Sequence, residues 1–170
     1  MTRQSRTLAL AMAAVAILAG TIVAQPSPIY IWNSSASVAV GLYRMRPAGN
    51  HYITELVAVR PPDPLASYLN LNGYLPTGVP MLKHVLALPR QIVCRSGSTI
   101  TVDGIAMGEA RERDSRGRTL PEWEGCRVIG EGELFLMNWQ SAESFDGRYF
   151  GITPAAAVIG QVVPVWVWED

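Results

Sequence analysis

Lys83 is the only lysine among the fourteen basic residues of the 170-residue chain, and its surroundings could give it unusual chemistry. It stands inside the apolar stretch 79–88. An arginine keeps its proton in practice, whereas burial lowers the pKa of a lysine toward the range of a useful general base. The alternative is a lysine whose stem packs against the protein while its amine reaches water. The sequence therefore predicts a neutral lysine base or a structural surface lysine.

A general base needs a nucleophile, and the segment 33–43 (NSSASVAVGLY) offers two alternating serines, Ser35 and Ser37. A serine-rich linker is the alternative interpretation of this segment. The chain has no G-x-S-x-G motif, which marks the nucleophile of many serine hydrolases. His51 and His84 leave a Ser-His-Asp triad open, although no local motif favours one. We therefore expect serine chemistry with lysine as the base.

The N-terminal segment predicts export. Arg3 and Arg6 precede the uncharged stretch 7–24, which as a helix would be about 27 Å long, close to the ~30 Å of a membrane core. Positive charges before such a stretch keep the N-terminus in the cytoplasm and send the rest of the chain across the inner membrane. A cleaved secretory signal is the alternative, although cleavage after Ala24 would put Ile22 at a position where small residues are usual. Both interpretations place the rest of the chain outside the inner membrane.

Cys94 and Cys126 are the two cysteines. In an exported domain, one pair of cysteines most simply forms a disulfide. A zinc site can be drawn from this pair with His51 and His84, but their spacing does not match any usual metal motif. We expect a disulfide and no metal.

The chain divides into an N-terminal anchor, residues 1–24, and one exported domain, residues 25–170. Short strand patterns recur in this domain, with one helix expected near 65–70. The strands are expected at 52–60, 81–88, 91–94, 99–102, 105–107, 133–138 and 157–168. Gly160 and Pro164 mark bulges or edges of the last strand. The pattern predicts a mainly β fold, an irregular antiparallel or barrel-like sheet following one transmembrane helix.

Composition excludes one class of function. Fourteen basic and fourteen acidic residues leave a formal net charge of zero, and charged residues are only 16% of the chain. Binding of nucleic acid through bulk positive charge is therefore not expected. Apolar residues make up 49%, enough to form a folded core.

Three segments in order resemble the boxes of the signal peptidase I superfamily of Ser–Lys peptidases, most closely its TraF-type branch of conjugal transfer peptidases, which mature pilin. Residues 33–43 are similar to the box S-x-P-x-G-L-Y. Residues 82–89 (LKHVLALP) resemble K-R-V-x-x-x-P-G-D, and residues 144–151 (SFDGRYFG) resemble S-x-D-S-R-Y-x-G. The segment 114–126 and the ending 164–166 are also TraF-like. Together they span nearly the whole chain.

The resemblance implies a role for four residues. Ser37 would attack the scissile carbonyl, and neutral Lys83 would take its proton and later give it to the leaving amine. Ser35 would add a hydroxyl to the oxyanion hole beside the Ser37 backbone N–H, and Ser144 would orient the lysine amine. No cofactor is implied.

The third box also implies a supporting ion pair between Asp146 and Arg148, which we interpret as structural. The chain departs from the branch at several positions. Ala39 replaces the proline of the first box, Arg90-Gln91 replaces Gly-Asp after Pro89, and Gly147 replaces a serine. These departures predict altered efficiency and specificity, with the nucleophile and base both present.

The implied function is a membrane-anchored serine endopeptidase that processes an exported precursor, a conjugative pilin in the TraF branch, on the periplasmic side of the bacterial inner membrane. Some members of the branch also join the ends of the pilin into a circle. A general leader peptidase is one alternative, although that enzyme would carry methionine after its serine, where this chain has Val38. A catalytically degenerate assembly or binding protein of the envelope is the other.

Overall fold

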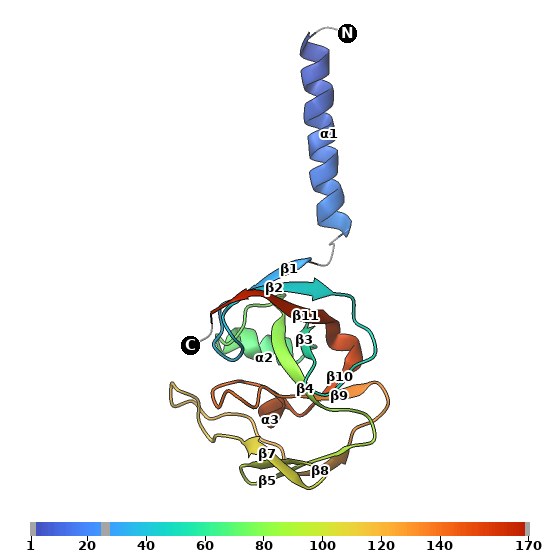
Figure 1. Ribbon diagram of the computed structural model, residues 1–170. Helices are drawn as coiled ribbons and strands as arrows, with labels where there is room; N and C mark the ends of the chain where they lie inside the picture. Colours follow the sequence, from blue (N-terminus) through green and yellow to red (C-terminus); the bar gives the residue numbers. More distant parts are fainter. Residues whose placement is uncertain (1–2, 25–27, 169–170) are drawn as a thin grey trace.

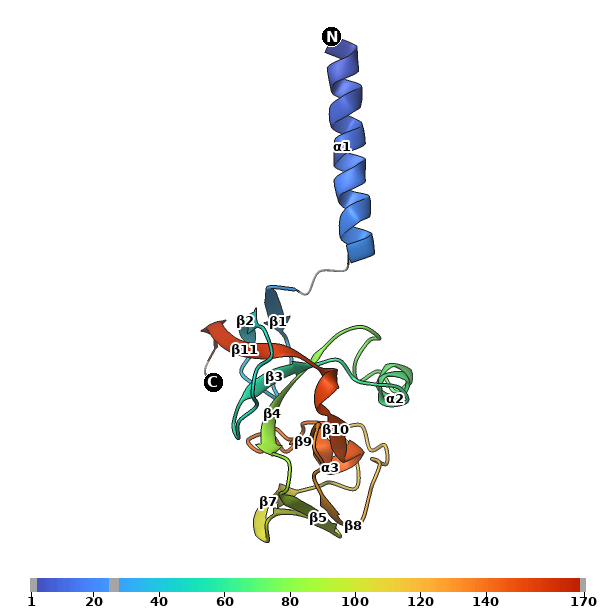
Figure 2. The same cartoon turned by 90° about the vertical axis from the view of Figure 1, so that its right-hand side faces the viewer.

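The computed structural model describes residues 3–24 and 28–168 of the chain. One helix, α1 (Arg3–Ala24), stands apart from a domain built mainly of strands (Figures 1 and 2). The strands are β1 (Tyr30–Asn33), β2 (Gly41–Arg46), β3 (Leu56–Val59), β4 (Met81–Ala87), β5 (Ile92–Ser96), β6 (Thr99–Val102), β7 (Ile105–Glu109), β8 (Gly125–Val128), β9 (Glu133–Leu136), β10 (Ile152–Pro154) and β11 (Val158–Val167). The shorter helical elements are α2 (Leu65–Leu71), α3 (Gly147–Phe150) and the 3₁₀ turn η1 (Ala155–Ala157).

The strands form two sheets, and every pairing is antiparallel. The larger sheet has the order β1-β2-β11-β3-β4-β9-β10, and the smaller has the order β7-β6-β5-β8. The prediction of a mainly β, antiparallel fold is confirmed. The barrel-like part of that prediction is not seen, because each sheet is open and ends on two edge strands in the part of the chain that the structure describes.

Two packed layers explain why the centre of the larger sheet is so apolar. Leu134 and Leu136 of β9 pack into a core with α2, while Phe135 and Met137 pack into a second core with the smaller sheet. Successive side chains of a strand point to opposite faces, so a strand covered on both faces needs an unbroken apolar run. β4 lies beside β9 and is buried at every position except His84, which is half-buried. This buried strand carries Lys83.

The last strand, β11, connects the two halves of the larger sheet by pairing with both β2 and β3. Its register shifts between Val158 and Gly160 and again between Pro164 and Trp166, as predicted from Gly160 and Pro164. A Cβ atom at Gly160 would lie 2.5 Å from the carbonyl oxygen of Arg46, so only glycine fits this contact.

The smaller sheet contains the expected disulfide, because Cys94 of β5 and Cys126 of β8 lie directly opposite each other and are bonded. The predicted hairpin at 99–107 is also present, with Asp103 and Gly104 in the turn between β6 and β7.

The prediction of a transmembrane helix needs correction. A helix does form, at Arg3–Ala24. Within the residues that the structure describes, however, no helix is long and apolar enough to cross a membrane. The first turn of α1 is Arg-Gln-Ser-Arg, which makes this part of the helix polar.

Candidate active site

Lys83 lies in the middle of β4, paired with Val57 of β3, and only 5% of its surface is exposed. Its Nζ atom donates a hydrogen bond to Ser144 Oγ at 2.8 Å. Burial lowers the pKa of Lys83 to about 8, against an upward influence of Asp146. At neutral pH a fraction of about a tenth is then uncharged. The amine is thus buried, so a snorkelling side chain is not observed, and the role of Lys83 as a base stays a prediction.

Ser144 is buried, and a network around Arg148 holds the segment that carries it. The guanidinium of Arg148 donates to both carboxylate oxygens of Asp146 at 2.9 Å and to the carbonyl oxygens of Ser141 and Ser144 at 2.6 and 3.2 Å. The Asp146 carboxylate also accepts the backbone N–H of Asn138 at 3.0 Å. Asp146 and Arg148 are thus a buried ion pair. Their hydrogen bonds to Asn138, Ser141 and Ser144 hold the loop 138–146, which carries the hydrogen-bond partner of the lysine amine.

The turn that carries Ser35 and Ser37 is held by the Asn33 side chain. Its amide donates to the carbonyl oxygens of Ser35, Val38 and Ala39 at 2.8 to 3.0 Å. A second hydrogen bond to the Ala39 carbonyl, at 2.6 Å, comes from the hydroxyl of Tyr43. These four hydrogen bonds restrain the turn at the position where Ala39 replaces the proline of the first box.

Ser35 and Ser37 contact each other directly. Ser35 Oγ donates to Ser37 Oγ at 3.1 Å, and it accepts the Ser37 backbone N–H at 3.4 Å. A hydroxyl and an N–H therefore lie side by side at the serine. These are the two kinds of donor that an oxyanion hole uses.

A cavity of about 270 Å³ brings the predicted residues together: Ser35, Ser37, Lys83 and Ser144 all line it. Its remaining walls are largely apolar, with Leu69, Leu75, Val79, Met81 and Phe145 among them. In this arrangement the lysine amine is hydrogen-bonded to Ser144, and the Ser37 hydroxyl is hydrogen-bonded to Ser35. The arrangement can hold a small apolar side chain beside a serine and an amine that can lose its proton.

The two histidines are engaged elsewhere. His51 Nδ1 lies 2.8 Å from Glu55 Oε2, and His84 Nδ1 lies 3.0 Å from Asn138 Oδ1. His84 and Ser37 do line a second cavity, of about 460 Å³, on the other side of the serine. Burial lowers the pKa of His84, and its ring is packed against Trp139. The hydrogen bonds of the two rings thus go to Glu55 and Asn138 and do not build a Ser-His-Asp triad.

Arg90 and Gln91, which depart from the branch after Pro89, both have a defined place in the loop. Arg90 has a φ of 77°, the left-handed conformation that glycine adopts most easily. The Gln91 side chain accepts the backbone N–H of Leu88 and donates to Asp103, both at 2.9 Å or less. The loop therefore keeps its turn, and Arg90 adopts the conformation usual for glycine.

Gly147 is the third departure, and the structure explains it by packing. A Cβ atom there would lie 2.7 Å from the Leu136 carbonyl oxygen and 2.9 Å from the Phe135 ring. The space that a serine side chain would need is already filled.

Two asparagines of the site were missed by the sequence reasoning. Asn33 begins the first box, but nothing in its neighbours signals three carbonyl partners. Asn138 is fully buried and connects β4 to the loop by donating to the Leu82 carbonyl and accepting the His84 N–H. For Asn138 the sequence offered one signal. A polar residue that ends an apolar strand must find hydrogen-bond partners if it is buried with that strand.

The structure shows no metal centre among the residues that it describes: nowhere do three or more His, Cys, Asp or Glu side chains gather to hold an ion. Cys94 and Cys126 are bonded to each other, so neither thiol is available as a ligand.

Known proteins resemble this chain over almost its full length. A sequence model of the family described as Signal peptidase, peptidase S26, matches residues 2–168. The chain is 33% identical to the Conjugal transfer protein TraF of Agrobacterium fabrum (strain C58) over 153 residues, 82% of this chain and 84% of that protein. It is 30% identical to a Plasmid transfer protein TraF of Escherichia coli over 167 residues, 94% and 90% of the two chains. A solved signal peptidase I from Enterococcus faecalis V583 aligns with a TM-score of 0.41 and 18% identity, over 68% of this chain and 98% of that one.

Proposed function

Because the chain belongs to the signal peptidase family, peptidase S26, we propose that it is a serine endopeptidase with Ser37 as nucleophile and Lys83 as general base. One observation carries this proposal. The only lysine of the chain is buried, is hydrogen-bonded to Ser144, and lines the same cavity as Ser37. A purely structural lysine would gain nothing from burial next to a serine, since burial of its charge is unfavourable.

The proposed reaction follows the usual acyl-enzyme sequence. Ser37 Oγ attacks the scissile carbonyl carbon while its proton passes to the neutral amine of Lys83. The oxyanion that forms accepts hydrogen bonds from the Ser37 N–H and the Ser35 hydroxyl. Lys83 then gives the proton to the leaving amine as the peptide bond breaks. A water molecule, deprotonated by Lys83, hydrolyses the ester and restores Ser37.

We assign Ser144 a positioning role. Its Oγ accepts a hydrogen bond from the lysine amine, so it orients the amine and restricts its rotation. Asp146 and Arg148 support this contact indirectly, because Arg148 donates a hydrogen bond to the Ser144 carbonyl oxygen.

The proposed substrate is an exported precursor protein, and a conjugative pilin is the first candidate. Similarity to the transfer proteins of A. fabrum and E. coli over more than four fifths of the chain supports this choice. The apolar walls of the 270 Å³ cavity fit a small or apolar residue before the scissile bond. General leader peptidase activity is the second candidate, and joining of the product ends is a third outcome that the same acyl-enzyme would allow.

We propose that the domain works in the periplasm, at the surface of the inner membrane. The disulfide supports an oxidising compartment. Trp32, Trp166 and Trp168 form one contacting cluster, and each is about half exposed. Trp32 is on β1, Trp166 is on β11, and Trp168 directly follows β11. Both strands lie at the end of the domain nearest α1 (Figure 1). Tryptophan is enriched where proteins meet the membrane interface.

Co-expression of the full chain with candidate pilin precursors, read by mass spectrometry, tests the function. Cleavage should be lost in Ser37→Ala and in Lys83→Met. The matched control is His84→Gln. His84 follows Lys83 in β4 and lines the 460 Å³ cavity together with Ser37. We expect this variant to keep activity within a few-fold.

Each outcome separates the hypotheses. Cleavage by Ser37→Ala would disprove the proposed nucleophile. Loss of cleavage in His84→Gln together with full activity in Lys83→Met would favour a Ser-His mechanism. Binding of a precursor without any cleavage by the parent chain, in detergent and in lipid, would favour the envelope binding protein. A product mass smaller by one water than that of the linear peptide would reveal joined ends.

A further inference from the structure

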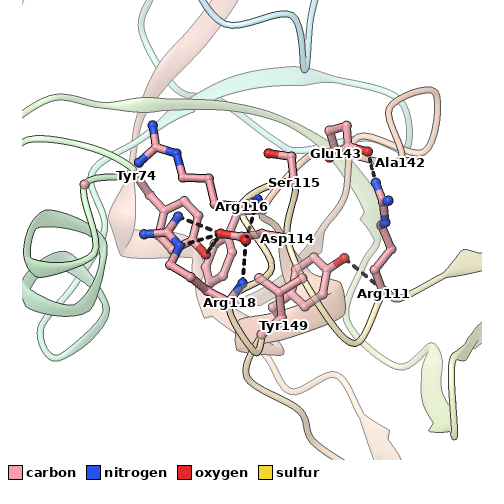
Figure 3. A pocket seen from close by; sticks show the side chains of 12 residues that line it. Tyr74, Arg111, Asp114, Ser115, Arg116, Arg118, Ala142, Glu143 and Tyr149 are labelled. Atoms are coloured by element: carbon pink, nitrogen blue, oxygen red, sulfur yellow. Dashed lines mark hydrogen bonds and ion pairs between the residues drawn. The ribbon is translucent and has the colours of Figure 1, made fainter.

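A third cavity, rich in arginine, adjoins the proposed active site. Its volume is about 360 Å³, and it is lined by the loop 111–118 on one side and by Tyr74, Phe145 and Tyr149 on the other. Figure 3 shows charged side chains gathered around it. The charged residues of the wall are Arg111, Arg116, Arg118, Asp114 and Glu143. Three arginines against two carboxylates leave one uncompensated positive charge.

Two of these five charged residues, Asp114 and Arg118, are already paired within the protein. Asp114 accepts hydrogen bonds from the Tyr74 hydroxyl at 2.7 Å and from Arg118 Nε at 2.6 Å, as well as from two backbone N–H groups. Although burial raises it, the hydrogen bonds from Tyr74 and Arg118 hold the pKa of Asp114 well below its usual range. Arg118 also donates to the Asn72 carbonyl and lies 4.3 Å from the centre of the Tyr74 ring. Asp114 and Arg118 therefore form a fixed, neutral part of the wall.

The other two arginines are available to a ligand. The guanidinium of Arg116 is exposed and forms no hydrogen bond or ion pair with any residue that the structure describes (Figure 3). Arg111 pairs with Glu143, but both side chains are exposed, at 45% and 59%. Exposed ion pairs of this kind are weak, so Arg111 can exchange Glu143 for another carboxylate at small cost.

The floor between these groups is rigid and aromatic. Tyr74, Phe145 and Tyr149 stack in a row with ring centres 5.0 and 5.2 Å apart. The Tyr149 hydroxyl accepts the backbone N–H of Arg111 at 3.1 Å. This packing fixes the start of the loop and therefore the place from which Arg111 extends.

This cavity lies next to the cavity that contains the proposed catalytic residues. Tyr74, Glu143 and Phe145 line both cavities. Glu143 directly precedes Ser144, the partner of the Lys83 amine. A polypeptide held at Ser37 that extends past these three residues would reach the arginine-rich cavity.

We infer that this cavity binds a carboxylate of the precursor while the precursor is held at Ser37, with Arg116 and Arg111 as its ligands. The inference rests on the proposed function. A guanidinium matches a carboxylate with two parallel hydrogen bonds, which is the geometry that gives arginine its preference for such groups. The carboxylate can belong to an acidic side chain or to the free C-terminus of the precursor, and the two sources can be told apart.

The test uses the full chain in detergent and synthetic peptides with an alanine-rich cleavage site. One Glu is scanned along the peptide against a Gln counterpart, and each peptide is made with a free and with an amidated C-terminus. The enzymes are the parent chain, Arg116→Gln, and Arg113→Gln as the matched control. Arg113 lies in the same loop but outside the cavity wall, where its side chain binds the Gly117 carbonyl.

For the parent chain, we expect KM to be about tenfold lower for the peptide that places its carboxylate in the cavity than for its neutral counterpart, with kcat unchanged. In Arg116→Gln this difference should largely disappear, whereas Arg113→Gln should retain it. Loss of the difference with Glu→Gln identifies an acidic side chain, and loss with amidation identifies the C-terminus. Equal KM values for all peptides with the parent chain, or equal losses in Arg113→Gln and Arg116→Gln, would overturn the inference.

The same comparison can be made without catalysis. In the Ser37→Ala background, calorimetry measures the Kd of each peptide, and we expect the same tenfold difference and the same dependence on Arg116. Carboxylate-dependent binding by a chain whose parent never cleaves would support this inference while refuting the proposed function. Cleavage by the parent without any dependence on the carboxylate would do the reverse.

Discussion

At the scale of single residues, the proposed chemistry depends on the protonation state of Lys83. Lys83 is on β4, which lies between β3 and β9 in the sheet, and its buried amine has Ser144 as its hydrogen-bond partner. The charged form loses its hydration there, and Asp146 offsets only part of that loss. The fold therefore lowers the affinity of this amine for protons, and this is the property that a base needs at the pH where the domain works.

The pH dependence of cleavage should report this pKa. We expect kcat/KM to rise about tenfold per pH unit below pH 7 and to level off above a pH of about 8, since only the neutral amine takes the Ser37 proton. Steady-state cleavage of a peptide without titratable groups, measured from pH 5.5 to 9.5, checks the prediction. A flat profile across this range would argue against Lys83 as the base.

The free energy of unfolding should also depend on pH because of Lys83. The pKa of Lys83 is about 8 in the folded protein and 10.5 as its ordinary value, so the unfolded chain binds more protons between these two pH values. The free energy of unfolding therefore rises by about 3 kcal/mol in total, because of Lys83, as the pH increases from about 8 to 10.5.

Replacing Lys83 by Met removes this dependence. We expect Lys83→Met to be more stable than the parent by up to about 3 kcal/mol at pH 7, and this advantage to shrink as the pH approaches 10. Urea unfolding of both proteins at pH 7 and pH 10 measures it, and the contributions of other groups cancel in the difference. If the difference in unfolding free energy between the two proteins were the same at pH 7 and pH 10, the Lys83 amine would be charged and hydrated in the folded protein.

At the scale of elements, two strands and one loop determine the geometry around the amine. β4 supplies Lys83, β9 leads into Asn138, and the loop 138–146 brings Ser144 back to the lysine. Asp146, which receives three hydrogen bonds from Arg148 and one from Asn138, ties the two ends of this loop together. Gly147 follows at once, and its lack of a side chain lets α3 pack directly on β9.

This packing predicts the result of restoring the serine of the family's third box. Gly147→Ser should destabilise the protein by about 1–3 kcal/mol, because the new side chain would overlap the Leu136 carbonyl and the Phe135 ring. It should also lower kcat by moving Ser144. Gly49→Ser is the matched control, since a Cβ atom at Gly49 has no neighbour within 4 Å. Chemical denaturation and cleavage assays of both variants test this, and a Gly147→Ser protein with raised activity would contradict it.

The smaller sheet depends on its disulfide in a measurable way. The bond joins residues 32 positions apart, and closing a loop of that length contributes about 3–4 kcal/mol in the chain-entropy description. We expect Cys94→Ser/Cys126→Ser to lose about this much stability in urea unfolding. The parent chain should show a matching loss in the presence of a reductant. Equal midpoints for the parent with and without reductant would show that the bond adds nothing.

At the scale of the whole molecule, the proposed membrane contact lies at one end. The tryptophan cluster consists of Trp32 on β1, Trp166 on β11 and Trp168 directly after β11. These two strands lie beside the end from which α1 extends, while the smaller sheet lies at the opposite end (Figures 1 and 2). The Ser37 turn connects β1 to β2 at the same end. Such an arrangement would keep the nucleophile near the membrane surface.

The cluster should contribute to lipid binding independently of catalysis. We expect Trp166→Ser/Trp168→Ser in the full chain to weaken binding to vesicles of bacterial lipid about tenfold, because about half of each indole is exposed and available for burial. Cleavage of a water-soluble peptide should change little. Ile105→Ser is the control, since Ile105 is 67% exposed but lies on the smaller sheet. Equal weakening by both changes would rule out a specific role of the cluster.

The sequence by itself determined the local features. The β class, the hairpin at 99–107, the shifts of β11 at Gly160 and Pro164, and the apolar strand around Lys83 all follow from short patterns that act over a few residues. The residue types also restricted the chemistry to a serine with an amine or an imidazole as base. Catalytic roles at Ser37 and Lys83 stay predictions until the variants are made.

The tertiary structure alone decided which of these residues meet. Lys83 and Ser144 are 61 positions apart, and their hydrogen bond depends on the pairing of β4 with β9 and on the Asp146–Arg148 loop. The fold also places Asp114 of the charged segment 111–118 against Tyr74 and makes part of this loop the wall of a cavity. The pKa of an amine and the ligand of an arginine are set by what surrounds them in space. That environment is supplied by segments far away in the chain, which no local pattern records.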